Sequence, residues 1–400
     1  MTKKYSQELV QGYTMSTVME EAQRCLLCHD APCSNACPAG TDPAKFIRSV
    51  RFRNFKGAAE TIRSNNALGA ACARICPTER YCEQGCSRCG IDKPINIGGI
   101  QRFVTDFEEQ CGMKVLEKGA ANGKRIAVIG SGPAGLQAAA TLLQLGYEVE
   151  IFEKADRAGG FLRTIPEYRL PETVVDGEIE RVVALGAVIH CGVDVDKAKF
   201  EELKAGYDAV LVATGVRKPM ILDLFQGNPN VVSAVDLLTE IRSKHGGMNV
   251  PASALVLGGG DSAMDAATTL KMLGVKDVIE VTRNEFRASD AEKATAHEMG
   301  VITIGGYTPA AVDGKTVTFK HSRLNSELKI EAELIVVALG QNIDNELGLP
   351  VERNEVVAEG TSVDGKVFVA GDIAKGDKTV VAAVNKGKLA AYEIHNRIGG

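Results

Sequence analysis

From Arg125 onward, short apolar runs, glycine-containing turns and amphipathic stretches alternate along the chain. RIAVIG at 125–130, the stretch 136–145 and YEVEIFE at 147–153 read as strand, helix and strand, because short apolar runs bounded by glycine are typical of buried parallel strands. The same order returns as ALVLGGG, the stretch 263–273 and DVIEVTR. Two such units predict two nucleotide-binding domains of the doubly wound α/β type.

The N-terminal region has a different pattern. Residues 43–53 and 55–64 have helical spacing and little alternates as a strand would, so a small helical domain is expected there. Near the end, KVFVAGD and the helical stretch 380–397 are expected to close the first nucleotide-binding domain, with the second one inserted in it. The expected divisions are a helical domain at 1–110, a linker at 111–123, the first nucleotide-binding domain at 124–218 and 343–400, and the second at 219–342.

Composition and charge narrow the classes of function. The chain of 400 residues has 46 Lys and Arg against 51 Asp and Glu, a net charge of −5, which argues against nucleic-acid binding. No apolar run reaches the ~18 residues of a membrane span, and MTKKYSQELV lacks the apolar core of a signal peptide. A cytoplasmic protein without membrane contact is expected.

The first glycine-rich turn has the features of a dinucleotide fingerprint. Gly130 permits a tight turn, Gly132 lets the backbone approach a pyrophosphate, and Gly135 allows close packing of helix on strand. Glu153 ends the next strand, where an acid is expected to bind ribose hydroxyls. The whole turn, with Ser131, Pro133 and Ala134, is a candidate cofactor site.

The second turn is the expected nicotinamide site. It comprises Gly258, Gly259, Gly260, Asp261, Ser262 and Ala263, with Ala in place of the third glycine. The following strand has no acid at its tip. Arg283 there favours a 2′-phosphate and NADP(H), whereas Glu285 favours a free ribose and NAD(H); Arg287 is another candidate for the phosphate. NAD(H) is the expected cofactor.

Cysteines are crowded into the N-terminal region: of the 11 in the chain, only Cys191 follows Cys111. No pair of cysteines therefore accompanies the two glycine-rich turns, which excludes disulfide-reductase chemistry. The run Cys25, Cys28, Cys33, Cys37-Pro38 resembles a ferredoxin run, and Cys76-Pro77, Cys82 and Cys86 follow it. Zinc is the alternative, but iron–sulfur clusters fit this spacing better. Seven cysteines leave two four-ligand clusters one ligand short.

Three segments resemble the N-terminal half of dihydropyrimidine dehydrogenase: CLLCHDAPCSNACP, ALGAACARICPTERYCEQGC and PINIGGIQRF. The resemblance spans nearly the whole chain and implies two [4Fe–4S] clusters, one of them with a glutamine ligand. Cluster one would take Cys25, Cys28, Cys33 and Cys86. Cluster two would take Cys37, Cys76, Cys82 and Gln101. Cys72, Cys89, Cys111 and Cys191 match no ligand position.

The same resemblance implies the cofactor contacts. FAD would be bound by the first fingerprint and by further residues matched by motif: Gly160, Leu162, Arg169, Val195, Gly371, Asp372 and Thr379. NAD(H) would be bound by the second fingerprint with Arg283 and by the turn formed by Ala338, Leu339 and Gly340.

The resemblance also implies a partner. The family continues into an FMN-binding barrel and a ferredoxin-like tail, and this chain has neither, so it is similar to a flavin- and NAD-binding subunit of a two-subunit enzyme. The partner would be an FMN and iron–sulfur subunit that reduces uracil or thymine with electrons passed from NADH through FAD and the clusters. Glutamate synthase small subunits and ferredoxin–NADP reductases share the architecture and are the alternative enzymes. From another class, an iron–sulfur redox sensor is the alternative.

A basic stretch suggests where that partner docks. Residues 45–63 contain one acid, Glu60, and six basic residues: Lys45, Arg48, Arg51, Arg53, Lys56 and Arg63. A solvated helical face that also balances the negative charge of the clusters is the favoured explanation. As a docking face, it would steer the partner electrostatically.

Overall fold

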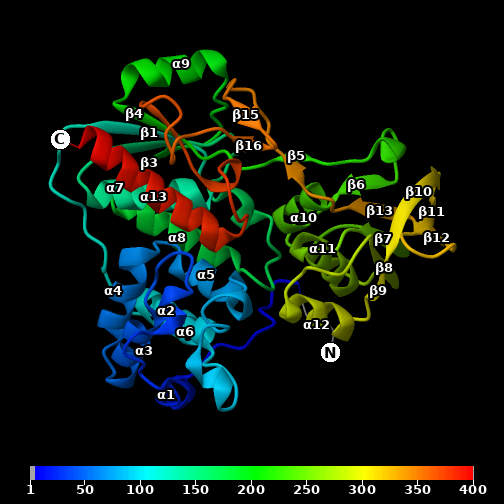
Figure 1. The fold of residues 1–400 in the computed structure, drawn as a ribbon, viewed down its shortest axis with the longest axis horizontal. Helices are drawn as coiled ribbons and strands as arrows, with labels where there is room; N and C mark the ends of the chain where they lie inside the picture. The colour runs from blue at the N-terminus through cyan, green and yellow to red at the C-terminus, as the bar shows by residue number, and fades with distance from the viewer. Residues whose placement is uncertain (1–4, 400) are drawn as a thin grey trace. The chain divides into compact units, whose positions relative to one another are not determined.

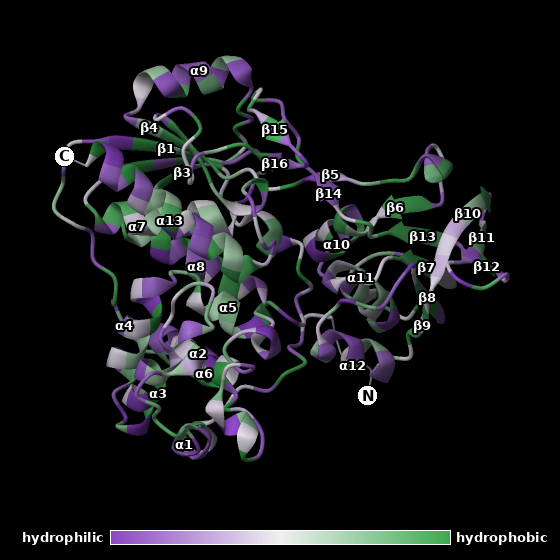
Figure 2. Ribbon diagram, in the orientation of Figure 1, coloured by the Kyte–Doolittle hydropathy of each residue, from purple (hydrophilic) through white to green (hydrophobic). Residues whose placement is uncertain are grey.

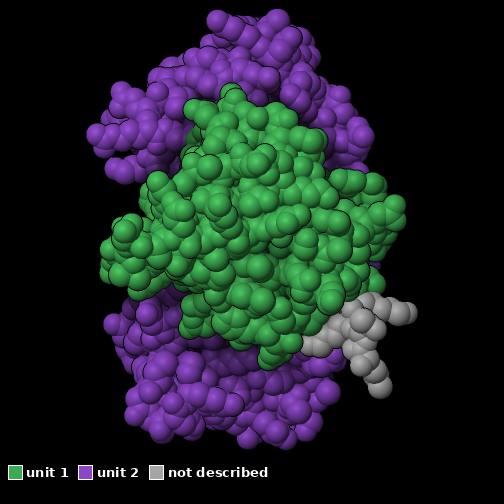
Figure 3. Space-filling model, turned by 90° about the vertical axis from the view of Figure 1, so that its right-hand side faces the viewer, with its two compact units in different colours: residues 1–9, 163–171, 217–342 green, residues 10–162, 172–216, 343–400 purple. Residues whose placement is uncertain are grey.

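The computed structural model describes residues 5–399, so residues 1–4 and 400 of the expected domains lie outside the described residues. Contacts divide the chain into two compact units (Figures 1 and 3). Unit 1 comprises 1–9, 163–171 and 217–342, and unit 2 comprises 10–162, 172–216 and 343–400. The cysteine-rich helices and the first nucleotide-binding domain thus belong to a single unit.

The cysteine-rich part of unit 2 is helical, as its spacing predicts. Its helices are α1 (Met15–Gln23), α2 (Pro32–Asn35), α3 (Pro43–Arg51), α4 (Phe55–Asn65), α5 (Gly69–Ile75) and α6 (Ile97–Gln110), with 3-10 turns at Thr78–Arg80 and Ser87–Gly90. Phe46, Ile62 and Ile100 lie in their common core, against which Cys25, Cys33 and Cys86 pack. The cysteines are therefore attached to a packed scaffold.

Unit 2 also contains a five-stranded parallel sheet in the order β17-β4-β1-β2-β3. The strands are β1 (Arg125–Ile129), β2 (Glu148–Phe152), β3 (Val188–His190), β4 (Ala209–Val212) and β17 (Val367–Val369). Helices α7 (Pro133–Gln144), α8 (Glu172–Ala184) and α13 (Val380–Ile398) lie on one side and α9 (Lys197–Gly206) on the other (Figure 1). The hairpin of β15 (Val351–Glu352) and β16 (Glu355–Val356), η3 (Gly160–Arg163) and η5 (Gly371–Ile373) complete the unit.

Unit 1 is built on a second parallel sheet in the order β6-β13-β7-β8-β9. The strands are β6 (Val231–Ser233), β7 (Ser253–Leu257), β8 (Asp277–Thr282), β9 (Ile302–Gly305) and β13 (Leu334–Val337), and β7 and β13 are largely hydrophobic (Figure 2). Helices α10 (Ala234–Ser243), α11 (Asp261–Met272) and α12 (Asp290–Glu298) share one core with this sheet. The other core is shared with the antiparallel strands β10 (Tyr307–Asp313), β11 (Thr316–His321) and β12 (Glu327–Glu331).

Along the chain, residues 217–342 of unit 1 are inserted between β4 and β17 of the sheet in unit 2. The chain enters through β5 (Lys218–Pro219) and leaves through β14 (Gln341–Asn342), which pair antiparallel. The short turn at Asp223–Phe225 follows β5. Both fingerprint strands and helices thus form where the apolar pattern predicts them. Among the described residues, no helix is long and apolar enough to cross a membrane.

The expected linker has no regular structure, but it is fixed to the end of α7. The Gly119 and Asn122 amides donate to the carbonyls of Leu143 and Gly146 at 3.0 Å. A Cβ on Gly119 would lie 2.2 Å from the carbonyl oxygen of Gln144, so only glycine permits this approach.

Candidate flavin, nicotinamide and iron–sulfur sites

The loop between β1 and α7 leaves backbone space that suits a pyrophosphate. Gly130 has a φ of +99°, and a Cβ on Gly135 would lie 2.0 Å from the Gly130 carbonyl oxygen. Gly132 is the N-cap of α7, where no side chain caps the helix and a Cβ would meet no atom within 4 Å. The free amides at this helix start are a favourable anion site. Gly160 lies against Gly132, where a Cβ on Gly160 would approach the Gly132 Cα to 2.8 Å.

Glu153 reaches this loop from the end of β2. Its Oε2 accepts from the Ser131 amide at 2.9 Å and from the Ser131 hydroxyl at 2.5 Å, and its Oε1 accepts from the Ala155 amide at 2.8 Å. The Ser131 hydroxyl oxygen accepts from the Gly159 amide at 3.0 Å. The acid therefore shapes the phosphate loop itself, in addition to the ribose contact expected for it.

The Gly371-Asp372 pair lies beside the same loop. A Cβ on Gly371 would lie 3.1 Å from the Ala134 Cβ. Asp372 Oδ1 is buried without a hydrogen-bond partner, and burial raises the pKa of this carboxyl. A buried, unmatched acceptor beside a phosphate loop fits a ligand that supplies the donor, as a flavin ribityl chain does. Thr379 is the N-cap of α13 and accepts from the Ala382 amide at 3.3 Å.

The other residues implied for FAD lie in both units. Leu162, in η3, and Val195 are buried in unit 2. Arg169 belongs to unit 1, where its Nη1 binds both oxygens of Asp265 at 2.8 and 2.7 Å and its Nη2 binds Glu292 at 2.5 Å. The Arg169 guanidinium therefore has two carboxylate partners within unit 1.

The second fingerprint has the same backbone features in unit 1. Gly258 has a φ of +147°, and a Cβ there would lie 2.5 Å from the Ala338 carbonyl oxygen. Gly260 is the N-cap of α11, where no side chain caps the helix and a Cβ would meet no atom within 4 Å. Asp261 follows it and accepts from the Ser289 amide at 2.9 Å. Ser262 and Ala263 continue the first turn of the helix.

The residues expected to discriminate between NAD(H) and NADP(H) follow β8. Arg283 and Glu285 are both exposed, so exposure does not separate them. The loop then folds back, because the Arg287 amide donates to the Gly259 carbonyl at 2.6 Å.

The turn expected near the nicotinamide nucleotide follows β13. Leu339 packs in the core shared with β10–β12, and Gly340 has a φ of +109°.

The four thiols assigned to cluster one line a single pocket, although Cys86 is far from the others in sequence. Cys25, Cys28, Cys33 and Cys86 line it together with mostly apolar neighbours. All four are free cysteines. Burial raises the pKa of Cys33 to about 11, with the neighbouring Cys86 and Cys25 adding to it. Within residues 5–399, no group of three or more His, Cys, Asp or Glu side chains is arranged to hold a single metal ion.

The three thiols assigned to cluster two also lie near one another. Burial raises the pKa of Cys76, and the charges of Cys72, Cys82 and Cys37 contribute. Burial raises the pKa of Cys82 as well, with Glu83, Cys37 and Cys33 contributing, the last of them a thiol assigned to cluster one. A coordinated thiol is deprotonated, so an iron–sulfur cluster held here would overcome the raised pKa values of these thiols.

Two side chains are candidates for the eighth ligand that the resemblance implies. Gln101 donates its amide nitrogen to the Gly69 carbonyl at 2.7 Å. Cys72, which matches no ligand position, is buried beside Cys37 and Cys76, and burial raises its pKa to about 12. The spacing of the cysteines gave no sign that Cys72 lies with the cluster-two thiols.

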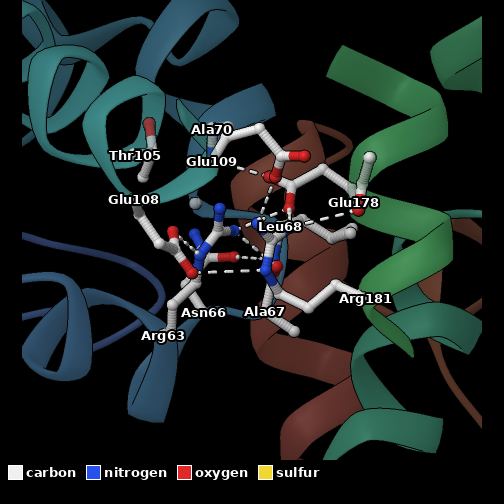
Figure 4. Close-up of polar contacts among 12 residues, drawn as sticks. Arg63, Asn66, Ala67, Leu68, Ala70, Thr105, Glu108, Glu109, Glu178 and Arg181 are labelled. Carbon is white, nitrogen blue, oxygen red and sulfur yellow. Dashed lines mark hydrogen bonds and ion pairs between the residues drawn. The ribbon is translucent and has the colours of Figure 1, made fainter. Parts of the chain in front are cut away.

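A buried ion-pair network joins the cysteine-rich helices to α8 of the nucleotide-binding domain (Figure 4). Arg63 of α4 is 1% exposed and binds Glu108 of α6 at 2.8 Å and Glu178 of α8 at 2.6 Å. Arg181 also binds Glu178, at 2.9 Å. The expectation that Arg63 belongs to an exposed basic face is therefore wrong: it lies on the buried side of α4, and the carboxylates that neutralise it are distant in sequence.

The rest of the basic stretch is mostly on the surface. Lys45, Arg48, Arg53 and Lys56 are exposed. Arg51 is half-buried and donates to the Cys25 carbonyl at 3.0 Å, next to the cluster-one thiols.

Comparison with protein families covers most of the chain. Residues 2–113 match the family described as dihydropyrimidine dehydrogenase domain II, 4Fe-4S cluster. Residues 124–387 match the family described as pyridine nucleotide-disulphide oxidoreductase.

Individual proteins also match most of the chain. The chain is 52% identical to the NAD-dependent dihydropyrimidine dehydrogenase subunit PreT of Escherichia coli O157:H7, over 99% of this chain and 98% of that one. It is 31% identical to the NADP(+)-dependent formate dehydrogenase subunit beta of Moorella thermoacetica, over 91% of this chain and 59% of that one. The T. acidophilum thioredoxin reductase structure matches the fold with a TM-score of 0.56 at 18% identity, over 69% of this chain and all of that chain.

Proposed function

Because the chain belongs to the family of NAD-dependent dihydropyrimidine dehydrogenase PreT subunits, we propose that it is the electron-input subunit of such an enzyme, with the pyrimidine site on a partner chain. The chain is an oxidoreductase of FAD, NAD(H) and 4Fe–4S type. When bound, the nicotinamide supplies a hydride, FAD accepts two electrons and releases them singly, and 4Fe–4S clusters carry single electrons.

The grouping of the cysteines is the observation that best supports this proposal. Cys25, Cys28 and Cys33 share one pocket with Cys86, as the resemblance implies for cluster one. Cys37, Cys76 and Cys82 lie close enough for their charges to interact, as it implies for cluster two. A redox sensor would have little need for two nucleotide sites, whereas an electron-input subunit needs both.

The chain's own residues bind and orient the cofactors. The free amides at the start of α7, with Asp372, would hold FAD, and those at the start of α11 would hold NAD(H). No general acid or base is assigned, because hydride transfer between two stacked rings depends mainly on orientation.

Reconstitution with the partner tests the proposal. The isolated chain should reduce a dye with NADH and leave uracil unchanged, whereas the chain with an FMN and iron–sulfur partner should reduce uracil or thymine with NADH. Dye reduction by a chain that co-purifies with a glutaminase-bearing or formate-oxidising subunit would instead assign the same electron-input chemistry to another enzyme.

We further propose NADH as the preferred donor, from Glu285 next to the tip of β8. The ratio of kcat/KM for NADH to that for NADPH, measured with a dye acceptor, tests this. A preference for NADPH that is lost in Arg283→Ala would assign the site to NADP(H).

A further inference from the structure

The carboxylate of Glu178, on α8, fixes the start of α5. Its Oε1 accepts from the Ala70 amide at 2.7 Å and from the Ala71 amide at 3.2 Å, so it satisfies two amides that the first turn of the helix leaves without partners. The other end of this seven-residue helix is Cys76, its C-cap. A shift at the start of α5 would therefore be transmitted along the helix to this thiol.

The same helix start orients the Gln101 amide. Gln101 lies on α6, and its Nε2 donates to the carbonyl of Gly69, the first residue of α5, at 2.7 Å. A carbonyl oxygen accepts only from a donor, so the amide nitrogen must face Gly69 and the amide oxygen remains for iron. The backbone carbonyl of Gln101 accepts from the Thr105 hydroxyl at 3.1 Å, which further fixes this turn of α6.

Glu178 is in turn held by buried charge. Its Oε2 accepts from Arg63 at 2.6 Å and from Arg181 at 2.9 Å. Arg63 also donates to Glu108 at 2.8 Å and to the Ala67 carbonyl at 2.7 Å (Figure 4). Both oxygens of Glu178 are thus engaged, one by arginines and one by α5. A side chain with fewer acceptors or a shorter reach cannot satisfy both sets of donors at once.

We propose that Glu178 is a positioning residue for cluster two. It holds the first turn of α5, to which the Gln101 side chain is hydrogen-bonded, and Cys76 lies at the other end of the same helix. The proposal rests on the proposed function, which makes Gln101 and Cys76 ligands of that cluster. It extends that function by assigning a role to a carboxylate in the nucleotide-binding domain that is not itself a ligand. Residues that orient metal ligands typically change metal affinity by about 10–100-fold when they are replaced.

Two variants of Glu178 and one control test this in the full-length protein, purified without oxygen. Glu178→Gln keeps the shape and loses the charge. Glu178→Asp keeps the charge but is one methylene shorter, so it cannot reach both Arg63 and the α5 amides. Glu109→Gln is the control, because Glu109 also binds Arg181, at 2.8 Å, but is exposed. The measurements are iron release to a ferrous chelator and electron paramagnetic resonance of the reduced clusters.

In both Glu178 variants we expect one cluster to release iron about 10-fold faster and to have an altered resonance spectrum, with the other cluster unchanged. The control should match the wild type. Variants that retain FAD and show wild-type iron release and spectra would overturn the proposal, as would equal loss from both clusters with a lower Tm. If Glu178→Gln retains no FAD, Glu178→Asp decides by the same criteria. A wild-type protein with fewer than two clusters would instead contradict the proposed function, before any variant is measured.

Discussion

Tyr81 donates its phenol O–H to the carboxylate of Asp377, although 296 positions separate them in the chain. Tyr81 precedes the cluster-two thiol of Cys82, and Asp377 lies between η5 and α13, in the segment that follows Asp372. The carbonyl of Asp377 also accepts from Lys386 at 2.8 Å. The bond therefore connects the segment next to the expected flavin site with the cysteine-rich region of the same unit.

Removing this bond should weaken flavin binding without unfolding the protein. In Tyr81→Phe the segment that follows Asp372 loses one anchor, at a free-energy cost of about 1 kcal/mol, which corresponds to a roughly fivefold higher Kd for FAD. Fluorescence of released FAD measures this Kd. Tyr392→Phe, at an exposed position of α13, is the control. An unchanged Kd in Tyr81→Phe would show that the bond does not support the flavin site.

The buried carboxyl of Glu280 predicts a pH dependence of stability. Glu280 lies on β8 with an exposed fraction of 0%, and both carboxyl oxygens lack a hydrogen-bond partner. Burial raises its pKa from 4.5 to about 8. Between these values the folded protein keeps a proton that the unfolded chain has lost, so the free energy of unfolding should fall by about 1.4 kcal/mol per pH unit as the pH rises.

Glu280→Gln should remove this dependence, because an amide does not ionise. The variant should gain stability over the wild type progressively from about pH 5 to pH 8 and by a constant amount above that. Denaturant unfolding at several pH values measures the difference. Glu331→Gln, the same change at an exposed position of β12, should show no such trend. Parallel pH profiles for Glu280→Gln and the wild type would contradict the prediction.

Replacing single cysteines should distinguish ligands from neighbours. Two clusters predict about eight irons per chain, and Cys82→Ser should lose close to half of them. Cys72→Ser should keep nearly all its iron, even though Cys72 is buried beside Cys37 and Cys76. Iron analysis of anaerobically purified protein decides. Depletion of a cluster in Cys72→Ser, together with full iron in Gln101→Leu, would make Cys72 the eighth ligand.

The exposed basic side chains are the ones to test for partner docking. Reversing the charge at Arg48 and Arg53 should slow electron transfer to the partner by about 10-fold at low salt and leave NADH–dye activity intact. Arg51 and Arg63 are unsuitable, because their guanidinium groups are bonded within the protein. Lys197→Glu, on α9, is the control. Equal rates for both variants at low salt would place the docking face elsewhere.

The spacing of apolar residues and glycines predicted both strand–turn–helix units of the nucleotide-binding domains. Gly130 and Gly258 lie where short apolar strands meet helices, and both turns form there with positive φ. The antiparallel strands β10–β12 were not predicted, although TVTFKH in β11 and ELKIE in β12 alternate polar and apolar residues as half-buried strands do. Arg63 was misplaced because a charged residue in a helix suggests solvent unless its partners, here Glu108 and Glu178, are known to lie beside it. Only tertiary structure brings those three side chains together.

The insertion of residues 217–342 also has a consequence for synthesis on the ribosome. The inserted unit has its own parallel sheet, so it can fold as soon as its last strand, β13, has emerged. The flavin-type sheet has to wait, because its edge strand β17 and the helix α13 are made last. Until then α7 lacks the helix that packs on it, where Gly387 approaches the Ala134 carbonyl so closely that a Cβ would lie 2.2 Å away. The nascent chain therefore exposes an apolar helix and an unpaired edge of β4 throughout translation of the insert, which is the period when a chaperone would have most to protect.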